Sequence, residues 1–124
     1  MSRTFIDKMA QAAWSGRLTY RVPSRTDPHE TYECELTSYH GNGRCPCRDF
    51  EMRFEPLLRR MVSPEAALRE GLVKQREYQR EGDVLRCEHL VQAHDEFHRE
   101  LMESLSEVER VKAERALAHG FHQA

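Results

Sequence analysis

Two short motifs in this chain combine residue types that bind metal ions. One is a Cys-Pro-Cys sequence at 45–47, and the other is a Cys-Glu-His sequence at 87–89. The chain has four cysteines, and three of them fall in these motifs. Three thiolates and one imidazole complete the tetrahedral shell of a structural Zn²⁺ ion. The motifs therefore predict one structural zinc site with the ligands Cys45, Cys47, Cys87 and His89.

Each motif has a single residue between its ligands, which restricts the backbone around it. A turn can bring Cys45 and Cys47 to one ion, and Pro46 fixes one φ angle close to the geometry required. In the middle of a helix, side chains two residues apart point about 200° apart. We therefore expect Cys87 to precede a helix and His89 to lie in its first turn. The dipole of that helix would also favour the Cys87 thiolate.

A Cys-x-Cys pair followed by a Cys-x-His pair resembles the SWIM zinc-finger family, in which a β-hairpin leads into the first pair and the second pair opens a helix. The alternating segment 32–36, Phe50 and the apolar segment 90–93 also fit that pattern. The resemblance covers residues 17–97. It implies the same four ligands, a role in binding DNA or protein, and no catalysis. The 39 residues from 48 to 86 exceed the usual spacing, and we interpret 50–82 as an inserted helical segment.

The cysteines also allow other interpretations. Two of them could form a disulfide, but residues 1–13 lack the apolar core of a secretory signal peptide. We therefore expect a cytoplasmic protein with reduced thiols. Cys34 alternates with Tyr32 and Leu36 and is expected to be a small core residue. It is the least expected ligand, although it could replace a missing one.

Length and composition predict a single domain, 1–124, of the α+β class. The chain has 19 Lys and Arg against 21 Asp and Glu, which gives a net charge of −2. This balance weakens the case for nucleic-acid binding, which depends on concentrated positive charge. No apolar run is long enough to span a membrane.

The pattern before the first motif predicts a helix over 4–14 that ends at Gly16, followed by an antiparallel pair of strands over 18–22 and 32–37. We expect Trp14 to be a core anchor. The residues expected to share one face of the helix are Phe5, Met9, Ala12 and Ala13.

The insertion contains two helix signals. Ser63 can cap a helix, with Pro64 and Glu65 in its first turn, and we expect this helix to run to about Arg80. A shorter helix before it is indicated by Phe54, Leu57, Leu58 and Met61, with Pro56 near its start.

Basic side chains of the insertion could form a phosphate-binding face. The candidates are Arg53, Arg59, Arg60, Arg69, Lys74 and Arg76. Acidic residues are interleaved with them, and Glu65 with Arg69 is an ordinary helical pair. The interleaving favours a solvated face of mixed charge.

The last third of the chain predicts one long helix, 88–118, with apolar residues at steps of three and four. Such a helix is longer than a domain of this size, so its distal part should extend beyond the zinc module. The candidate interface residues there are Leu101, Leu105, Val108 and Val111, with Leu117 continuing the stripe. The insertion helix, a second copy that would give a homodimer, or another protein could cover them, and packing against the N-terminal helix is the competing account.

Catalysis is not expected. His94 and His98 have a spacing that can bind metal from one helix, but the glutamate of the zinc-protease motif is missing. His119 and His122 are given no role. The predicted function is a zinc-binding interaction module: a small cytoplasmic accessory or adaptor protein that binds a protein partner. The alternatives are a DNA-binding zinc finger that uses the insertion arginines, or an inhibitor encoded by a phage or mobile element.

Overall fold

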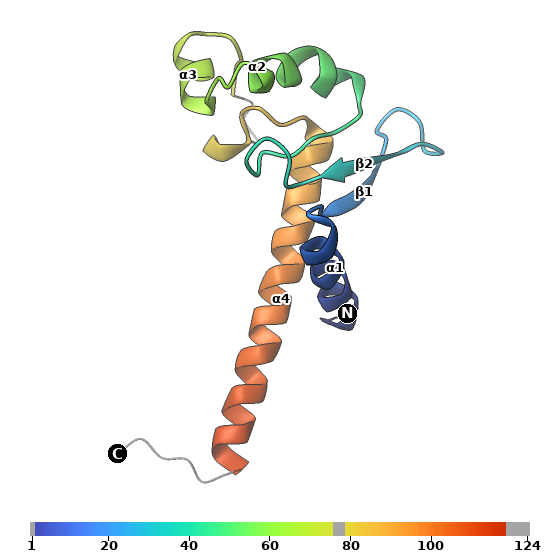
Figure 1. Ribbon diagram of the computed structural model, residues 1–124, viewed down its shortest axis with the longest axis vertical. Coiled ribbons are helices and arrows are strands. Elements are labelled where there is room, and N and C mark those ends of the chain that lie inside the picture. The colour runs from blue at the N-terminus through green and yellow to red at the C-terminus, as the bar shows by residue number, and fades with distance from the viewer. Residues whose placement is uncertain (1, 76–78, 119–124) are drawn as a thin grey trace.

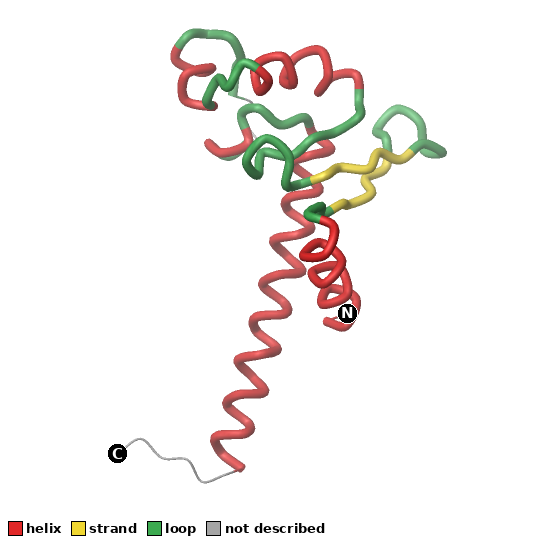
Figure 2. The backbone as a smooth tube through the Cα atoms, in the orientation of Figure 1, coloured by secondary structure: helices red, strands yellow, loops and turns green. Residues whose placement is uncertain are grey.

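The computed structural model describes residues 2–75 and 79–118, and it has the predicted α+β architecture. One long helix runs the length of the molecule, and every other element gathers around its N-terminal half (Figures 1 and 2). In chain order the elements are α1 (Ser2–Ser15), β1 (Thr19–Pro23), β2 (Thr31–Glu35), the π-helical turn η1 (Phe50–Phe54), α2 (Glu55–Arg59), α3 (Pro64–Arg69), the 3₁₀ turn η2 (Glu81–Asp83) and α4 (Glu88–Ala118).

The β1–β2 hairpin delivers the chain to the first cysteine pair. The strands are antiparallel, with Tyr20 opposite Cys34, and both of these side chains are buried. Beyond the hairpin, Glu35 and Arg44 exchange backbone hydrogen bonds of 2.9 and 2.7 Å, forming an isolated antiparallel bridge. This bridge fixes the backbone immediately before Cys45.

Helix α1 packs against the middle of α4. The Phe5 and Phe97 rings lie 6.2 Å apart, and the Lys8 ammonium is 3.0 Å from the buried Glu100 carboxylate. Tyr20 donates a 2.6 Å hydrogen bond to the same carboxylate from β1. These contacts tie the hairpin, α1 and α4 together.

Two expectations about the last turn of α1 were wrong. Trp14 is 89 % exposed and Ala13 is also exposed, so neither is part of the core. Ala12 does pack against the core. Because each helical residue turns the side chain by about 100°, Trp14 points about 200° away from Ala12, towards solvent.

Helix α3 begins as predicted but ends early. The Ser63 hydroxyl accepts a 3.1 Å hydrogen bond from the Ala66 amide, and Pro64 occupies the first turn. The helix ends at Arg69 and does not continue to Arg80. Gly71 adopts φ +71°, and the amide of Leu72 bonds to the Ala67 carbonyl at 2.9 Å, which is the Schellman type of helix end.

The inserted segment contributes to the central core. Phe50, Phe54, Leu57 and Ala67 are buried in the same cluster as the hairpin and the start of α4. Met61, which was expected to lie in the short helix of this segment, lies beyond the end of α2 with φ +59° and is 82 % exposed. The insertion therefore covers one side of the cysteine motifs.

Helix α4 has the predicted bounds. Its first turns are buried at Leu90 and Ala93, both 0 % exposed, whereas Leu105 and Val108 are 47 and 50 % exposed. In the part of the chain that the structure describes, no helix is both long and apolar enough to cross a membrane.

Candidate metal centre

The structure brings the four predicted ligands together. One donor atom from each of Cys45, Cys47, Cys87 and His89 lies within 4.8 Å of all the others. The three cysteines are buried, and His89 is partly buried. Two segments far apart in the sequence thus meet in one cluster that could hold a metal ion.

Cys47 and Cys87 occupy equivalent positions, because helical residues begin directly after each of them, at Arg48 and at Glu88. The carbonyl of Cys47 accepts from the Glu51 amide at 3.1 Å, and that of Cys87 accepts from the Val91 amide at 3.0 Å. The Phe50 amide also donates a 3.3 Å hydrogen bond to the Cys47 sulfur. Cys87 therefore precedes α4 as predicted, and both sulfurs lie where amide groups favour negative charge.

His89 points one nitrogen at the sulfurs. Its Nδ1 is 3.8 Å from the Cys45 Sγ and 3.9 Å from the Cys87 Sγ. A tetrahedral zinc shell separates nitrogen and sulfur ligands by about 3.5 Å and two sulfurs by about 3.8 Å. Nε2 is buried and has no hydrogen-bond partner among the described residues, and the Tyr32 ring packs against the imidazole, with 4.6 Å between the ring centroids. Nδ1 is thus the nitrogen placed to bind a metal.

The three thiols compete for one negative charge. Hydrogen bonds from the Cys45 and Cys87 thiols hold the pKa of Cys47 well below its usual range. The pKa of Cys45 is raised, chiefly by hydrogen bonding with Cys34 and then with Cys47. Hydrogen bonds with Cys45 and Cys47, followed by burial, raise the pKa of Cys87. A bound dication would relieve this competition, because it stabilises all three thiolates at once.

The donor set fits zinc better than a hard cation. Thiolate sulfur and imidazole nitrogen are ligands that Zn²⁺ prefers, whereas Mg²⁺ and Ca²⁺ take oxygen. Four protein donors also fill a tetrahedral shell and leave no position for a water nucleophile, as in structural zinc sites.

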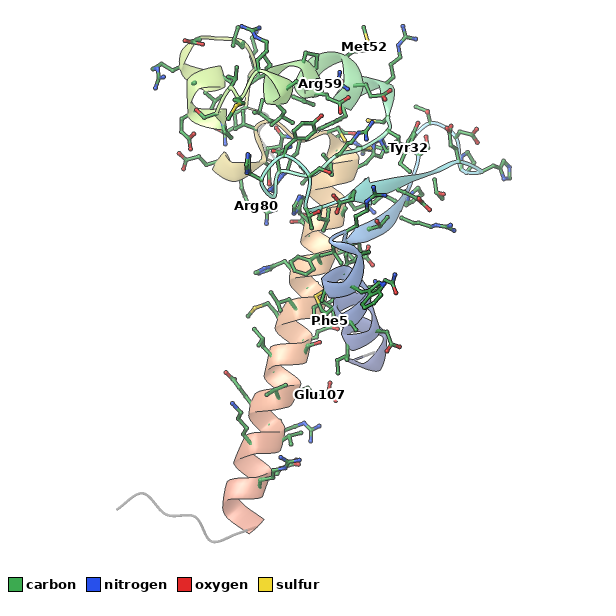
Figure 3. All side chains as sticks on the ribbon, viewed as in Figure 1. Phe5, Tyr32, Met52, Arg59, Arg80 and Glu107 are labelled. Carbon is green, nitrogen blue, oxygen red and sulfur yellow. The ribbon has the colours of Figure 1, made fainter. Side chains whose placement is uncertain are left out.

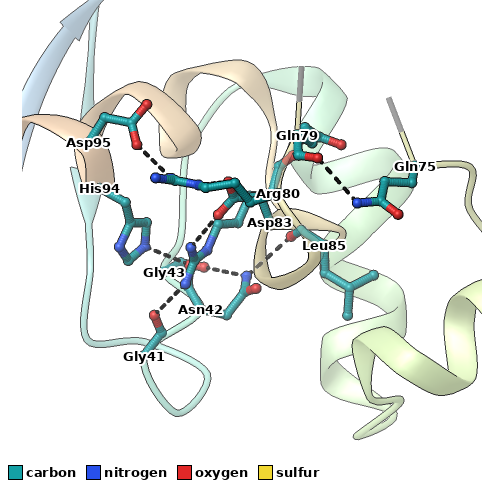
Figure 4. A network of polar contacts seen from close by, with 11 residues as sticks. Gly41, Asn42, Gly43, Gln75, Gln79, Arg80, Asp83, Leu85, His94 and Asp95 are labelled. Carbon is teal, nitrogen blue, oxygen red and sulfur yellow. Dashed lines mark hydrogen bonds and ion pairs between the residues drawn. The ribbon is translucent and has the colours of Figure 1, made fainter. Parts of the chain in front are cut away.

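A polar network next to the centre holds the same two segments together without a metal (Figure 4). The Arg86 guanidinium donates to the Asn42 carbonyl at 2.9 Å and to Asp83 at 2.7 Å. The His94 Nε2 is 2.9 Å from the Asn42 carbonyl, and Arg80 joins Asp83 to Asp95 on α4. The 41–43 turn is thereby fixed to the start of α4.

This network and the packing of Tyr32 against His89 were not predicted from the sequence, because both depend on contacts between distant segments. The pair His94 and His98 does not form a metal site among the described residues. His94 is engaged with the turn, and His98 is exposed. His119 and His122 lie outside the described residues.

The predicted phosphate-binding residues do not form one uniformly basic face. Arg53 pairs with Asp49, and Arg59 pairs with the buried Glu55. Figure 3 shows Arg59 on α2, away from Arg80 near α4. Arg60, Arg69 and Lys74 are exposed, and Arg76 lies outside the described residues.

The predicted interface residues are only partly covered. Leu101 and Val111 are half-buried, and Leu105 and Val108 are exposed. Glu107 projects from the same stretch of α4 where no other element lies beside it (Figure 3). The side chain of Leu117 is outside the described residues.

Comparison with known proteins adds no family assignment. No protein-family model matches the chain, and neither a curated protein nor a solved structure is significantly similar to it.

Proposed function

We propose that the chain is a zinc-stapled interaction module in which the metal joins the hairpin to the long helix. The observation that carries this proposal is the convergence of four soft donors, from segments 40 residues apart, within 4.8 Å. The zinc is structural, because the protein supplies all four ligands. The chain places a Cys-x-Cys pair after a hairpin and a Cys-x-His pair at the start of a helix. This order supports a SWIM-like module in which residues 50–82 are an insertion.

Metal binding and folding are coupled in this proposal. Each ligand pair is short and local, but the two pairs meet only when the hairpin lies against the first turn of α4. The free energy of binding the metal is then also free energy of folding.

The test is the metal content of protein purified under reducing conditions. One zinc per chain is expected, and Cys47→Ser or Cys87→Ser should remove it. Cys34→Ala is the matched control, because it changes a buried cysteine outside the four-donor cluster and should leave one zinc. Protein that is folded and free of metal would refute the proposal.

The module presents the distal part of α4 to a protein partner, as a cytoplasmic accessory or adaptor protein would. Leu105 and Val108 are about half exposed on a face flanked by charged residues such as Glu107 and Glu109. Apolar residues at steps of three and four with flanking charges are typical of helix–helix interfaces. The ion-paired arginines of the insertion favour this role over DNA binding.

A second copy of the chain is the first partner to test. In a parallel pair of α4 helices, Glu107 of one copy would face Lys112 of the other, which is the favourable charge combination across such an interface. Light scattering over a range of concentrations should show a dimer that Val108→Glu converts to a monomer. A concentration-independent monomer would require a different protein partner, and salt-sensitive binding to a DNA duplex would instead support the DNA-binding alternative.

A further inference from the structure

The fourth cysteine, Cys34, lies directly opposite the metal ligand Cys45 because of the strand register. Glu35 and Arg44 exchange both of their backbone hydrogen bonds, at 2.9 and 2.7 Å. In an antiparallel arrangement, the residues next to such a pair face each other without hydrogen bonds, and their Cα atoms are about 4.5 Å apart. Cys34 and Cys45 are that pair, and both are 0 % exposed.

Cys34 faces one ligand of the centre and stays outside the four-donor cluster. The Glu35–Arg44 bridge places it opposite Cys45, whereas the cluster of mutually close donors contains only Cys45, Cys47, Cys87 and His89. Cys34 is therefore not placed as a fifth ligand. It is placed as the partner of a single ligand.

This arrangement suits a disulfide. The Cα separation of a non-hydrogen-bonded antiparallel pair lies within the range of about 4.4–6.8 Å found for disulfides. The backbone bonds between Glu35 and Arg44 hold the pair in place whether or not a metal is bound. Pro46 has no amide hydrogen to extend the bridge, so Cys45 lies at its end, where the chain turns towards the metal centre.

We propose that Cys34 and Cys45 form an oxidisable thiol pair whose disulfide and the bound metal exclude each other. This inference rests on the proposed metal site, because Cys45 is one of its ligands. When the pair is oxidised, Cys45 is no longer available as a thiolate. Three ligands then remain, and the metal is released.

The oxidant is a hydroperoxide such as hydrogen peroxide. One sulfur of the pair attacks the peroxide as its thiolate, an S–O bond forms, the O–O bond breaks and hydroxide leaves. The other sulfur then attacks the oxidised one, the S–S bond forms, and the S–O bond breaks with loss of water that carries the proton of the second thiol. Two electrons pass from the two sulfurs to the peroxide.

Burial makes the reaction depend on the state of the metal centre. A surface hollow of about 310 Å³ reaches Tyr32, Cys47, Cys87 and His89, but not Cys45. In the metal-bound protein, both packing and coordination protect Cys45. Oxidation should therefore be faster once a chelator has removed the metal, and the disulfide should then prevent the metal from binding again.

The first experiment maps disulfides in the unmodified protein. Reduced protein of known metal content is treated with hydrogen peroxide, with and without EDTA, and the remaining thiols are alkylated before digestion and mass spectrometry. A Cys34–Cys45 linked peptide is expected as the main product, formed at least several-fold faster with EDTA. Metal-binding capacity should fall in proportion and return with a thiol reductant. A main product that links Cys47 to Cys45 or to Cys87 would overturn the proposal.

The second experiment uses Cys34→Ala, which keeps all four ligands. Release of zinc by peroxide, followed with a chromogenic chelator, should be at least several-fold slower in this variant than in the parent. Release at the parental rate would overturn the proposal, and if the variant does not fold, the peptide map decides. Protein purified without metal would refute the proposed function, whereas the peptide map would still test the thiol pair.

Discussion

The two halves of α4 share one helix and one apolar periodicity but have opposite environments. In the first half, Leu90 and Ala93 are 0 % exposed beneath the hairpin, the insertion and the metal centre. In the second half, Leu105 and Val108 continue the same stripe at about half exposure. The apolar periodicity of a helix thus shows which of its faces can be buried. It does not show whether the same chain or a partner buries that face.

The largest expected effect is a loss of stability when a proposed metal ligand in the first half of α4 is removed. Cys87→Ser removes a ligand from the start of α4, and we expect a loss of at least ~4 kcal/mol of stability, because structural zinc sites contribute folding free energy directly. Loss of near-UV circular dichroism and of a cooperative thermal transition would show it. Cys34→Ala is the control, and a Cys87→Ser protein that melts like the parent would contradict the prediction.

A pair of identical substitutions compares the halves directly. Leu90→Ala should destabilise the protein by about 2–5 kcal/mol, because it leaves a cavity in the core. Leu105→Ala, on the exposed half, should change the stability of the monomer by less than about 0.5 kcal/mol. Urea titrations at a concentration where the protein is monomeric measure both. Equal losses would mean that the distal half is covered after all.

A third prediction concerns the close packing of the 41–43 turn against the first half of α4. An added Cβ at Gly43, which has φ +96°, would lie 2.8 Å from the Leu90 Cδ2 and 3.1 Å from the His94 Nε2. Gly41 has a similar φ of +89° but no atom within 4 Å of an added Cβ. Gly43→Ala should therefore be less stable than Gly41→Ala by about 1–3 kcal/mol, as measured by urea unfolding. Equal stabilities would show that the helix is not tightly packed there.

The smallest expected effect is a dependence of the folding stability on pH, caused by His94 in the first half of α4. Burial, and then the nearby Arg86, lower the pKa of His94, while its hydrogen bond to Asn42 and the Asp83 charge act in the opposite direction. The unfolded chain therefore binds a proton more readily than the folded one. The stability due to neutral His94 is complete above about pH 6.5 and is lost as the pH falls towards the lower folded pKa.

Urea titrations between pH 7.5 and 5.5, with zinc in excess, would test this. His94→Gln should lose less stability over that range than the parent, whereas His98→Gln, an exposed change on the same helix, should behave like the parent. A parallel pH dependence in the parent and His94→Gln would contradict the prediction.

The features predictable from the sequence are those set by local chemistry. The residue types and spacing of Cys45, Cys47, Cys87 and His89 predicted a group that the fold does bring together. The caps and periodicity of α4 predicted its bounds. The early end of α3 has a local signal in Gly71, which adopts φ +71° at the end of the helix.

Other features could not be predicted because they depend on distant segments. The contact of Arg86 with Asn42 joins residues from either side of the insertion, and no local pattern marks it. The outward direction of Trp14 depends on which side of α1 meets α4. The proximity of Cys34 to Cys45 follows from the Glu35–Arg44 bridge, which forms only once the hairpin has turned back.

The length of α4 would convert a small change at the candidate metal centre into a larger displacement at the far end of the helix. The helix has 31 residues, so at about 1.5 Å per residue a tilt of about 5° at its first turn would move its far end by about 4 Å. Cys87 and His89 lie at that first turn and would set the angle together with the contacts that Phe97 and Glu100 make with α1. A small rearrangement of the ligands would thus become a displacement of several ångströms at the opposite end of the molecule, on the scale of a side chain in a partner's binding site.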